Sequence, residues 1–165
     1  MDKIAMGGGC HWCTEAVFQE LNGVQKVEQG FVASNEKTSS FSEAVIVHFD
    51  NNVISLSDLI KIHLYTHRST SNHSMRDKYR SAIYTFTFEQ HREAENALKQ
   101  LQSEFQLPLV TKVLPFSQFK PSAEHFRNYY SKNPEKPFCK RYIDPKLELL
   151  QKRFSKKLAD KKSLS

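Results

Sequence analysis

Hydrophobic and polar residues alternate along this chain with two different periods, and each period predicts one kind of secondary structure. A period of two indicates strands, whereas apolar residues spaced three and four apart indicate amphipathic helices. Strands are predicted at residues 4–6, 24–34, 43–49, 80–88 and 109–114, and helices at 14–22, 57–66, 90–105, 122–131 and from residue 144 onward. Residues 67–78 are rich in Ser, His and Asn without an apolar period, so they predict a loop.

The order of these elements, βαββαβαβαα, predicts an α+β fold in which helices cover a mixed β-sheet. This order resembles a ferredoxin-like α/β plait with a C-terminal helical extension. No repeat, low-complexity stretch or linker interrupts residues 1–165, and the length suffices for one hydrophobic core. We therefore expect a single domain.

The first predicted strand ends at three glycines, Gly7 to Gly9, and a helix pattern begins directly after them. Cys10 and Cys13 lie at this junction. Backbone N–H groups in the first turn of a helix lack an intrahelical partner, and together with the helix dipole they favour a thiolate. Cys10 is therefore expected to be more reactive than a free cysteine, and the glycines leave room for a substrate near its sulfur.

The predicted strand at residues 43–49 carries a carboxyl group on its hydrophobic face. Alternation places Glu43 on the same side as Val45, Val47 and Phe49. Burial without a cationic partner would favour the uncharged carboxyl group, which is then able to donate a proton near neutral pH. If the strand begins one residue later, Glu43 is solvated, and the pattern alone leaves both interpretations open.

Composition narrows the class of protein. The chain has 39% hydrophobic residues, three cysteines and a formal net charge of +6. Three cysteines do not form a disulfide framework, which indicates the cytoplasm and redox or catalytic thiols. No signal peptide and no run of 18 apolar residues are present, so no membrane association is expected. Much of the positive charge lies in the last predicted helix, where a solvated face is favoured over a nucleic-acid site.

The cysteines allow more than one chemistry. Cys10 and Cys13 have the spacing of a disulfide-exchange pair, although Cys13 alone also fits a small buried residue. A zinc site would use four ligands, namely Cys10, His11, Cys13 and Cys139. The usual second ligand pair at short spacing is missing, so no metal is expected. His63 and His67 have no further ligands at a typical interval and are predicted to lie on a helix surface.

Four blocks of the sequence resemble the A-type peptide-methionine sulfoxide reductases, whose nucleophile motif reads Gly-Cys-Phe-Trp. The blocks are residues 9–15 (GCHWCTE), 42–50 (SEAVIVHFD), 79–84 (YRSAIY) and 137–139 (PFC). The similarity extends to Pro145 and Lys146, beyond the last cysteine. It implies the plait fold and thiol-dependent reduction of the S epimer of methionine sulfoxide, free or in proteins.

The resemblance also implies a role for each residue of the site. Cys10 attacks the sulfoxide sulfur, Glu43 delivers a proton to the sulfoxide oxygen, and Tyr79 hydrogen-bonds that oxygen. Trp12 packs on the methyl group of the substrate. This agrees with the chemistry, because a sulfoxide oxygen is a poor leaving group until it is protonated.

Oxygen transfer leaves Cys10 as a sulfenic acid, which a second thiol must convert to a disulfide. Cys13 and Cys139 are the two candidates. Cys139 is slightly favoured because it lies on a proline-flanked segment that looks mobile, whereas Cys13 would have to unwind a helical turn. Thioredoxin would then reduce the disulfide, without a cofactor. We expect a monomer that binds neither nucleic acid nor membranes.

The sequence departs from the family pattern around the expected substrate-binding residues. His11 stands where the family has phenylalanine, and Phe31 and Phe138 stand where tyrosines are usual. The loop before Tyr79 is shorter, and a count back from Tyr79 places Ser74 at the family's aspartate. Asp77 is an alternative with a different offset. We therefore predict a narrower or weaker enzyme, in which His11 or His67 takes part.

Two other functions fit parts of the sequence. A thioredoxin-like disulfide oxidoreductase would use Cys10 and Cys13 but would have no use for Glu43, Tyr79 or Cys139. A non-catalytic methionine-binding module of the same fold would need none of the thiols.

Overall fold

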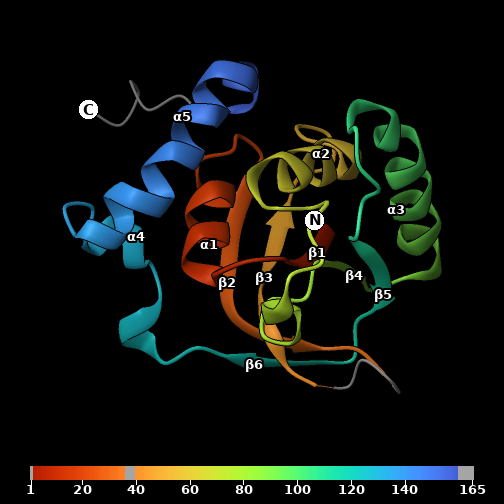
Figure 1. Cartoon of the computed structure of the whole chain (residues 1–165), viewed down its shortest axis with the longest axis horizontal. Helices are drawn as coiled ribbons and strands as arrows, with labels where there is room; N and C mark the ends of the chain where they lie inside the picture. The colour runs from red at the N-terminus through yellow and green to blue at the C-terminus, as the bar shows by residue number, and fades with distance from the viewer. Residues whose placement is uncertain (1, 36–39, 160–165) are drawn as a thin grey trace.

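The computed structural model describes residues 2–35 and 40–159, and these contain a six-stranded sheet (Figure 1). The strands are β1 (Asp2–Gly7), β2 (Val24–Ala33), β3 (Ser42–Phe49), β4 (Ala82–Thr85), β5 (Lys112–Pro115) and β6 (Gln118–Pro121). Their order across the sheet is β5-β4-β1-β3-β2-β6. The pair β4 and β5 is parallel, whereas the other neighbours are antiparallel. The predicted α+β fold with a mixed sheet is confirmed.

The helices that cover the sheet come from separate parts of the chain. They are α1 (His11–Gln19), α2 (Leu56–Thr66), α3 (Phe88–Leu101), α4 (Tyr129–Lys132) and α5 (Asp144–Arg153). Short turns of other helix types are η2 (Ser74–Asp77), η3 (Gln102–Glu104), η4 (Glu124–Phe126), η5 (Cys139–Ile143) and η6 (Ser155–Lys157). In Figure 1, α1 lies against the sheet, and α4 and α5 lie beyond α1, on the side away from α3.

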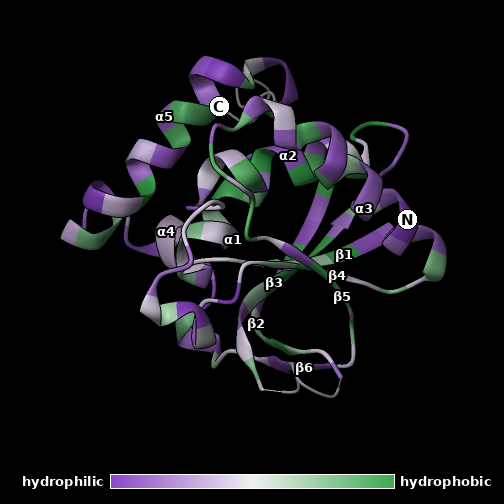
Figure 2. Ribbon diagram, turned by 45° about the vertical axis from the view of Figure 1, so that its right-hand side comes forward, coloured by the Kyte–Doolittle hydropathy of each residue, from purple (hydrophilic) through white to green (hydrophobic). Residues whose placement is uncertain are grey.

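The sheet has a hydrophobic cluster on each face. The larger cluster joins the strands to the helices and includes Ile4, Met6, Val45, Val47 and Phe49. Alternate strand residues, such as Ala5, Ala44 and Ile46, belong to the smaller cluster on the opposite face. Figure 2 shows α5 as mostly hydrophilic, with a few hydrophobic residues along its length. Glu43 precedes Val45, Val47 and Phe49 by even numbers of residues, so it lies on the same helix-covered face of the sheet, as predicted.

The structure corrects several predicted boundaries. The strand predicted at 80–88 is only β4, because the N–H of Phe86 donates to the Gln90 side chain and Thr87 caps α3. The helix predicted at 122–131 is divided into η4 and α4, because Asn128 has a φ of 55°, which an α-helix does not accommodate. The loop predicted at 67–78 contains the short turn η2.

Strand β6 was not predicted, and its close approach to β2 depends on a glycine. Gly30 pairs with Pro121, and a Cβ atom at Gly30 would lie 2.3 Å from the carbonyl oxygen of Lys120. Only a residue without a side chain allows β6 to pair there. Within the described part of the chain, no helix has both the length and the apolar character needed to cross a membrane.

Candidate active site

Cys10 occupies the N-cap of α1, where its carbonyl accepts hydrogen bonds from the N–H groups of Cys13 and Thr14. Its side chain is half-buried. The pKa of Cys10 is lowered, chiefly by a hydrogen bond from the Cys13 thiol and then by the backbone N–H groups of Trp12 and Cys13. Burial and the charge of Glu43 act in the opposite direction. The balance favours a thiolate at Cys10, which is the form that reacts as a nucleophile.

The other two thiols lie behind Cys10 in a buried cluster. Cys13 and Cys139 are both free and pack with Ala16 and Ile143. The pKa of Cys13 is raised, first by the hydrogen bond that it donates to Cys10, and burial raises that of Cys139. Cys139 begins η5 and has 0% of its surface exposed. The Cys139 sulfur is therefore enclosed in the reduced fold, and the mobility of its segment stays a prediction.

Glu43 is the second residue of β3 and is 7% exposed. Its Oε1 accepts the backbone N–H of His11 at 3.2 Å and lies 3.5 Å from His11 Nε2. The other oxygen, Oε2, lies 3.7 Å from the Lys78 ammonium group. Of the two alternatives that the sequence left open, the structure shows the buried one, and it places the Lys78 amine beside the carboxylate. The carboxylate belongs to a cluster with an imidazole and an amine beside the nucleophile.

Tyr79 is held beside Glu43 because its segment is bonded to the start of β3. The Lys78 carbonyl accepts the N–H of Glu43 at 3.1 Å and the hydroxyl of Ser42 at 2.9 Å. The same hydroxyl oxygen accepts the N–H of Arg80 at 2.8 Å. These bonds fix residues 78–80 against the strand that carries the carboxylate. Tyr79 itself is half-buried.

Lys78 is a site residue that the sequence reasoning missed. Its side chain is 57% exposed, and its amine lies 5.1 Å from the centre of the Tyr79 ring. The pKa of Lys78 is raised, first by the Tyr79 side chain and then by the charge of Glu43. The sequence signal that could have identified Lys78 was its position next to Tyr79. Lys78 places a positive charge at the mouth of the site, where Glu43 is reached from solvent.

Arg76 holds the shortened loop before Tyr79. Its guanidinium donates to the carbonyls of Ser71, Gly8 and Tyr79 at 2.9, 2.8 and 2.8 Å, and to that of Arg68. It therefore ties the loop to the glycine turn that precedes Cys10. Ser74 begins η2 and is exposed, and the structure gives it no part in these bonds. The side chain of Asp77 lies outside the described residues.

Aromatic rings border the nucleophile on two sides. Trp12 stacks on Tyr129 with ring centres 3.9 Å apart and meets the Phe138 ring edge-on at 5.3 Å. On the other side, the rings of His11 and Phe31 are 5.1 Å apart, and Phe31 is paired with Glu43 across β2 and β3. The structure thus brings together the predicted substrate-binding residues other than Ser74. Tyr129 was missed because it falls in the segment predicted as a longer helix.

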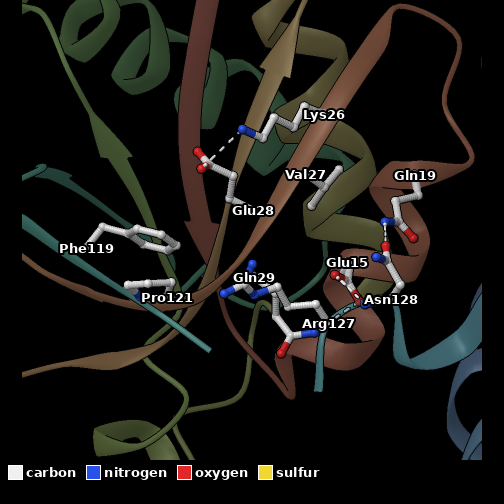
Figure 3. Close-up of a pocket in the computed structure, with 10 residues that line it drawn as sticks. All are labelled: Glu15, Gln19, Lys26, Val27, Glu28, Gln29, Phe119, Pro121, Arg127 and Asn128. Atoms are coloured by element: carbon white, nitrogen blue, oxygen red, sulfur yellow. Dashed lines mark hydrogen bonds and ion pairs between the residues drawn. The ribbon is translucent and has the colours of Figure 1, made fainter. Parts of the chain in front are cut away.

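Glu15 joins the nucleophile helix to the segment that carries Tyr129. Its carboxylate accepts the Gln29 side-chain amide and the backbone N–H of Asn128, both at 3.0 Å. It borders a cavity of about 380 Å³ on the flank of α1 that is also lined by Phe119 and Arg127 (Figure 3). Burial raises the pKa of Glu15, and its hydrogen bonds oppose that shift. No cysteine lines this cavity.

His63 lies inside the molecule at 1% exposure, so its predicted surface position is wrong, whereas His67 is half-buried. The two rings stack with centres 4.1 Å apart. His63 Nε2 bonds the Gly7 carbonyl at 2.8 Å, and His67 bonds the His63 carbonyl and, at 2.8 Å, the Ser81 hydroxyl. Burial lowers the pKa of His63 to about 4 and that of His67 well below its usual value. Both rings are neutral at pH 7 and support the glycine turn.

The described ranges, 2–35 and 40–159, contain no group of three or more His, Cys, Asp or Glu side chains that could hold a metal ion. The zinc interpretation required Cys10, His11, Cys13 and Cys139 to converge on one point. In the structure, His11 Nδ1 instead bonds the Gly30 carbonyl at 2.8 Å, and its Nε2 faces Glu43. The imidazole is thus engaged on the carboxylate side of the nucleophile.

Comparison with known proteins places the chain in a family. The family described as peptide methionine sulfoxide reductase matches residues 2–158. The peptide methionine sulfoxide reductase MsrA of Deinococcus radiodurans is 38% identical over 95% of this chain and 84% of its own length. That of Trichodesmium erythraeum is 34% identical over 93% and 96%, respectively. The chain belongs to the peptide methionine sulfoxide reductase family.

Solved structures share the fold. Mxr1 from Saccharomyces cerevisiae in its reduced form has a TM-score of 0.73 and 22% identity, over 84% of this chain and 88% of its own. Methionine sulfoxide reductase A of Corynebacterium diphtheriae has a TM-score of 0.71 and 22% identity, over 82% and 76%. Mxr1 in complex with Trx2 has a TM-score of 0.62 and 21% identity, over 78% and 84%.

The hydrogen bond from Cys13 predicts the reactivity of Cys10. Replacing Cys13 with Ala removes the donor, so the pH midpoint for alkylation of Cys10 by iodoacetamide should rise and the rate at pH 7 should fall several-fold. Cys13→Ser keeps a hydroxyl donor and should lie closer to the wild type. Peptide mass spectrometry over a pH series gives the midpoints. Equal midpoints in Cys13→Ala and the wild type would contradict this account.

The buried His63 predicts a loss of stability in acid. Its pKa is 6.5 when unfolded and about 4 when folded, so the unfolded chain binds the extra proton. The contribution of neutral His63 to the free energy of unfolding is fully present above pH 6.5. It is lost as the pH falls toward 4, and the loss is roughly 3 kcal/mol in all. Urea unfolding from pH 7.5 to 4.5 should show a shallower loss for His63→Gln than for the wild type. The exposed His125, changed to Gln, should leave the wild-type slope unchanged.

Proposed function

We propose that this chain reduces the S epimer of methionine sulfoxide, free or in proteins, through a sulfenic acid at Cys10. The observation that carries the proposal is the hydrogen bond between the His11 N–H and the buried Glu43 carboxylate. It places a cluster able to supply a proton directly beside a thiol whose pKa is lowered. Family membership and the matched residues 2–158 support the same reaction.

Oxygen transfer consumes one proton. The Cys10 thiolate attacks the sulfoxide sulfur, and the oxygen is protonated and transferred to Cys10, so that the products are a sulfenic acid and a thioether. In this proposal Glu43 delivers the proton, with His11 and Lys78 sharing its charge, and Tyr79 hydrogen-bonds the oxygen. Trp12, backed by Tyr129 and Phe138, is the apolar wall for the substrate's methyl group.

The sulfenic acid is then resolved within the same buried cluster. The Cys13 thiol already donates a hydrogen bond to Cys10, whereas Cys139 packs behind Cys13. We therefore propose a first disulfide between Cys10 and Cys13, followed by exchange to Cys139. This reverses the preference from the sequence, which rested on a mobile Cys139. Thioredoxin is proposed as the external reductant, because the related fold of Mxr1 has been solved in complex with Trx2.

The two other functions leave part of this arrangement unexplained. A disulfide oxidoreductase of the Cys10 and Cys13 pair has no use for a buried carboxylate bonded to the nucleophile helix. A methionine-binding module has no use for a thiol with a lowered pKa. Reduction of a sulfoxide uses both features.

The activity is tested by incubating the protein with each epimer of N-acetylmethionine sulfoxide and dithiothreitol. The S epimer should be reduced and the R epimer should not. Cys10→Ser should abolish turnover, and Glu43→Gln should lower kcat about 100-fold, since positioned proton transfer contributes on the order of 100- to 10,000-fold. If the wild type reduces neither epimer, the proposal is wrong. If the wild type instead reduces a disulfide substrate, and Cys10→Ser and Cys13→Ser both lose this activity while Glu43→Gln keeps it, the oxidoreductase interpretation is correct.

Lys78 should affect oxygen transfer through its charge. We expect Lys78→Met to lower kcat/KM for the S epimer roughly 10-fold, because a charge that stabilises the developing oxyanion is lost. Lys78→Arg keeps the charge and should retain most of the rate. Lys99→Met, an exposed change on α3, is the control. Equal rates for Lys78→Met and the control would exclude Lys78 from the reaction.

A further inference from the structure

A small cavity lies between α1, α2 and α5, behind the nucleophile. Its volume is about 40 Å³, which is enough for one water molecule at roughly 30 Å³ each. Its polar lining consists of Cys10, Cys13, Thr14, His63, Thr66, His67 and Lys146. The cavity therefore joins both thiols of the first disulfide to an amine from a distant part of the chain.

Lys146 supplies the positive charge of this cavity. It lies in the first turn of α5, and its amine donates to the carbonyl of Thr66 at the end of α2. The surrounding rings of His63 and His67 are neutral at pH 7, because burial lowers their pKa. Burial also lowers the pKa of Lys146, whereas a negative charge on Cys13 or Cys10 acts to raise it.

Other titratable groups act on the cavity from its edges. Glu43 faces Cys10 from β3 and opposes its ionisation. Cys139 on η5 is held as a thiol, because burial raises its pKa. Arg68 acts on Lys146 and Arg76 on His63, both from the loop after α2. Cys13 thus has one cation near it, the Lys146 amine, and, in the reduced protein, one anion, the Cys10 thiolate.

Oxidation of Cys10 changes this balance. The hydrogen bond that Cys13 donates to Cys10 and the charge of Cys10 both raise the pKa of Cys13. The charge is lost when Cys10 becomes a neutral sulfenic acid, and a hydrogen bond to a neutral group holds the Cys13 proton less strongly than one to a thiolate. Burial still raises the pKa of Cys13 after oxidation, and Lys146 still lowers it. Cys13 is therefore kept protonated until Cys10 has accepted the oxygen.

We propose that Lys146 is a positioning residue for the resolving step, stabilising the Cys13 thiolate as it attacks the Cys10 sulfenic acid. This inference rests on the proposed function. The sulfur of Cys13 forms a bond with that of Cys10, the S–O bond of the sulfenic acid breaks, and the oxygen leaves as water with the proton of Cys13. No other oxidant is consumed. The cavity beside both sulfurs has room for the water that leaves.

A single-turnover experiment without reductant separates the two steps. Protein with all thiols reduced is mixed with the S epimer of N-acetylmethionine sulfoxide. Release of N-acetylmethionine reports oxygen transfer, dimedone labelling reports the sulfenic acid, and peptide mapping reports the disulfide. The variants are Lys146→Met and Lys146→Gln, with Lys146→Arg to keep the charge. Lys152→Met, an exposed change near the end of α5, is the matched control.

We expect oxygen transfer in Lys146→Met and Lys146→Gln to slow by no more than about three-fold, because the charge of Lys146 acts more on Cys13 than on Cys10. Formation of the disulfide between Cys10 and Cys13 should slow at least 10-fold at pH 7, with more dimedone adduct. The deficit should shrink as the pH rises, because hydroxide then ionises Cys13, and Lys146→Arg should restore the rate. A merely structural role would not produce this dependence on pH.

The inference is overturned if the disulfide forms at the wild-type rate in the neutral variants, if Lys146→Arg is as slow as Lys146→Met, or if Cys139 forms the first disulfide. If one neutral variant fails to fold, the other gives the same comparison. Failure of the proposed function is a separate result, since the wild type would then release no N-acetylmethionine.

Discussion

The hydrogen bond between the Glu43 carboxylate and the N–H of His11 joins the middle of the sheet to the first turn of α1. Everything that acts on Cys10 is arranged around this bond. It holds the first turn of the helix, whose Trp12 and Cys13 N–H groups act on the sulfur, against the strand, and it sets a carboxylate near that sulfur. The approach is close, since a Cβ atom at Gly7 would lie 2.6 Å from the Glu43 carbonyl oxygen. Glu43 can therefore lie where it does only because residue 7 is a glycine.

The charges of the site are divided between two compartments on either side of Cys10. On the open side, Lys78 and His11 surround Glu43, where a sulfoxide oxygen would need a proton. On the closed side, Lys146 faces Cys13 among neutral rings. Lys78 is thus the lysine on the Cys10 side of the site, and Lys146 is the lysine on the Cys13 side. Oxygen transfer and disulfide formation can therefore be served by different residues of the same short helix turn.

Features set by local sequence could be predicted, and features set by distant contacts could not. The strand-to-helix junction at Cys10 and the buried face of Glu43 follow from glycine placement and period-two alternation. Strand β6 is short, lies at the sheet edge and depends on Gly30, which is far from it in the sequence. The break at Asn128 depends on a bond to Glu15, across the molecule. No periodicity encodes contacts of this kind.

The residues of the candidate site divide in the same way, into those set by local sequence and those set by distant contacts. The resemblance named the nucleophile, the carboxylate and the aromatic residues, because they lie in compact motifs. Lys78, Arg76 and Lys146 are ordinary surface residue types in the sequence, and only the fold brings them to Cys10. His63 was assigned to a helix surface because its helix was read without the glycine turn that covers it.

The burial of Cys139 has a consequence for recycling. Of the three sulfurs, Cys10 is the one with a half-exposed position in the reduced fold, whereas Cys139 at the start of η5 is fully buried in the cluster that Phe138 packs against. A bulky protein reductant cannot reach a sulfur that is sealed in this way. If the disulfide ends on Cys139 as proposed, a protein reductant reaches that sulfur only after residues 138–143 open locally, and this opening would then limit regeneration of the thiols.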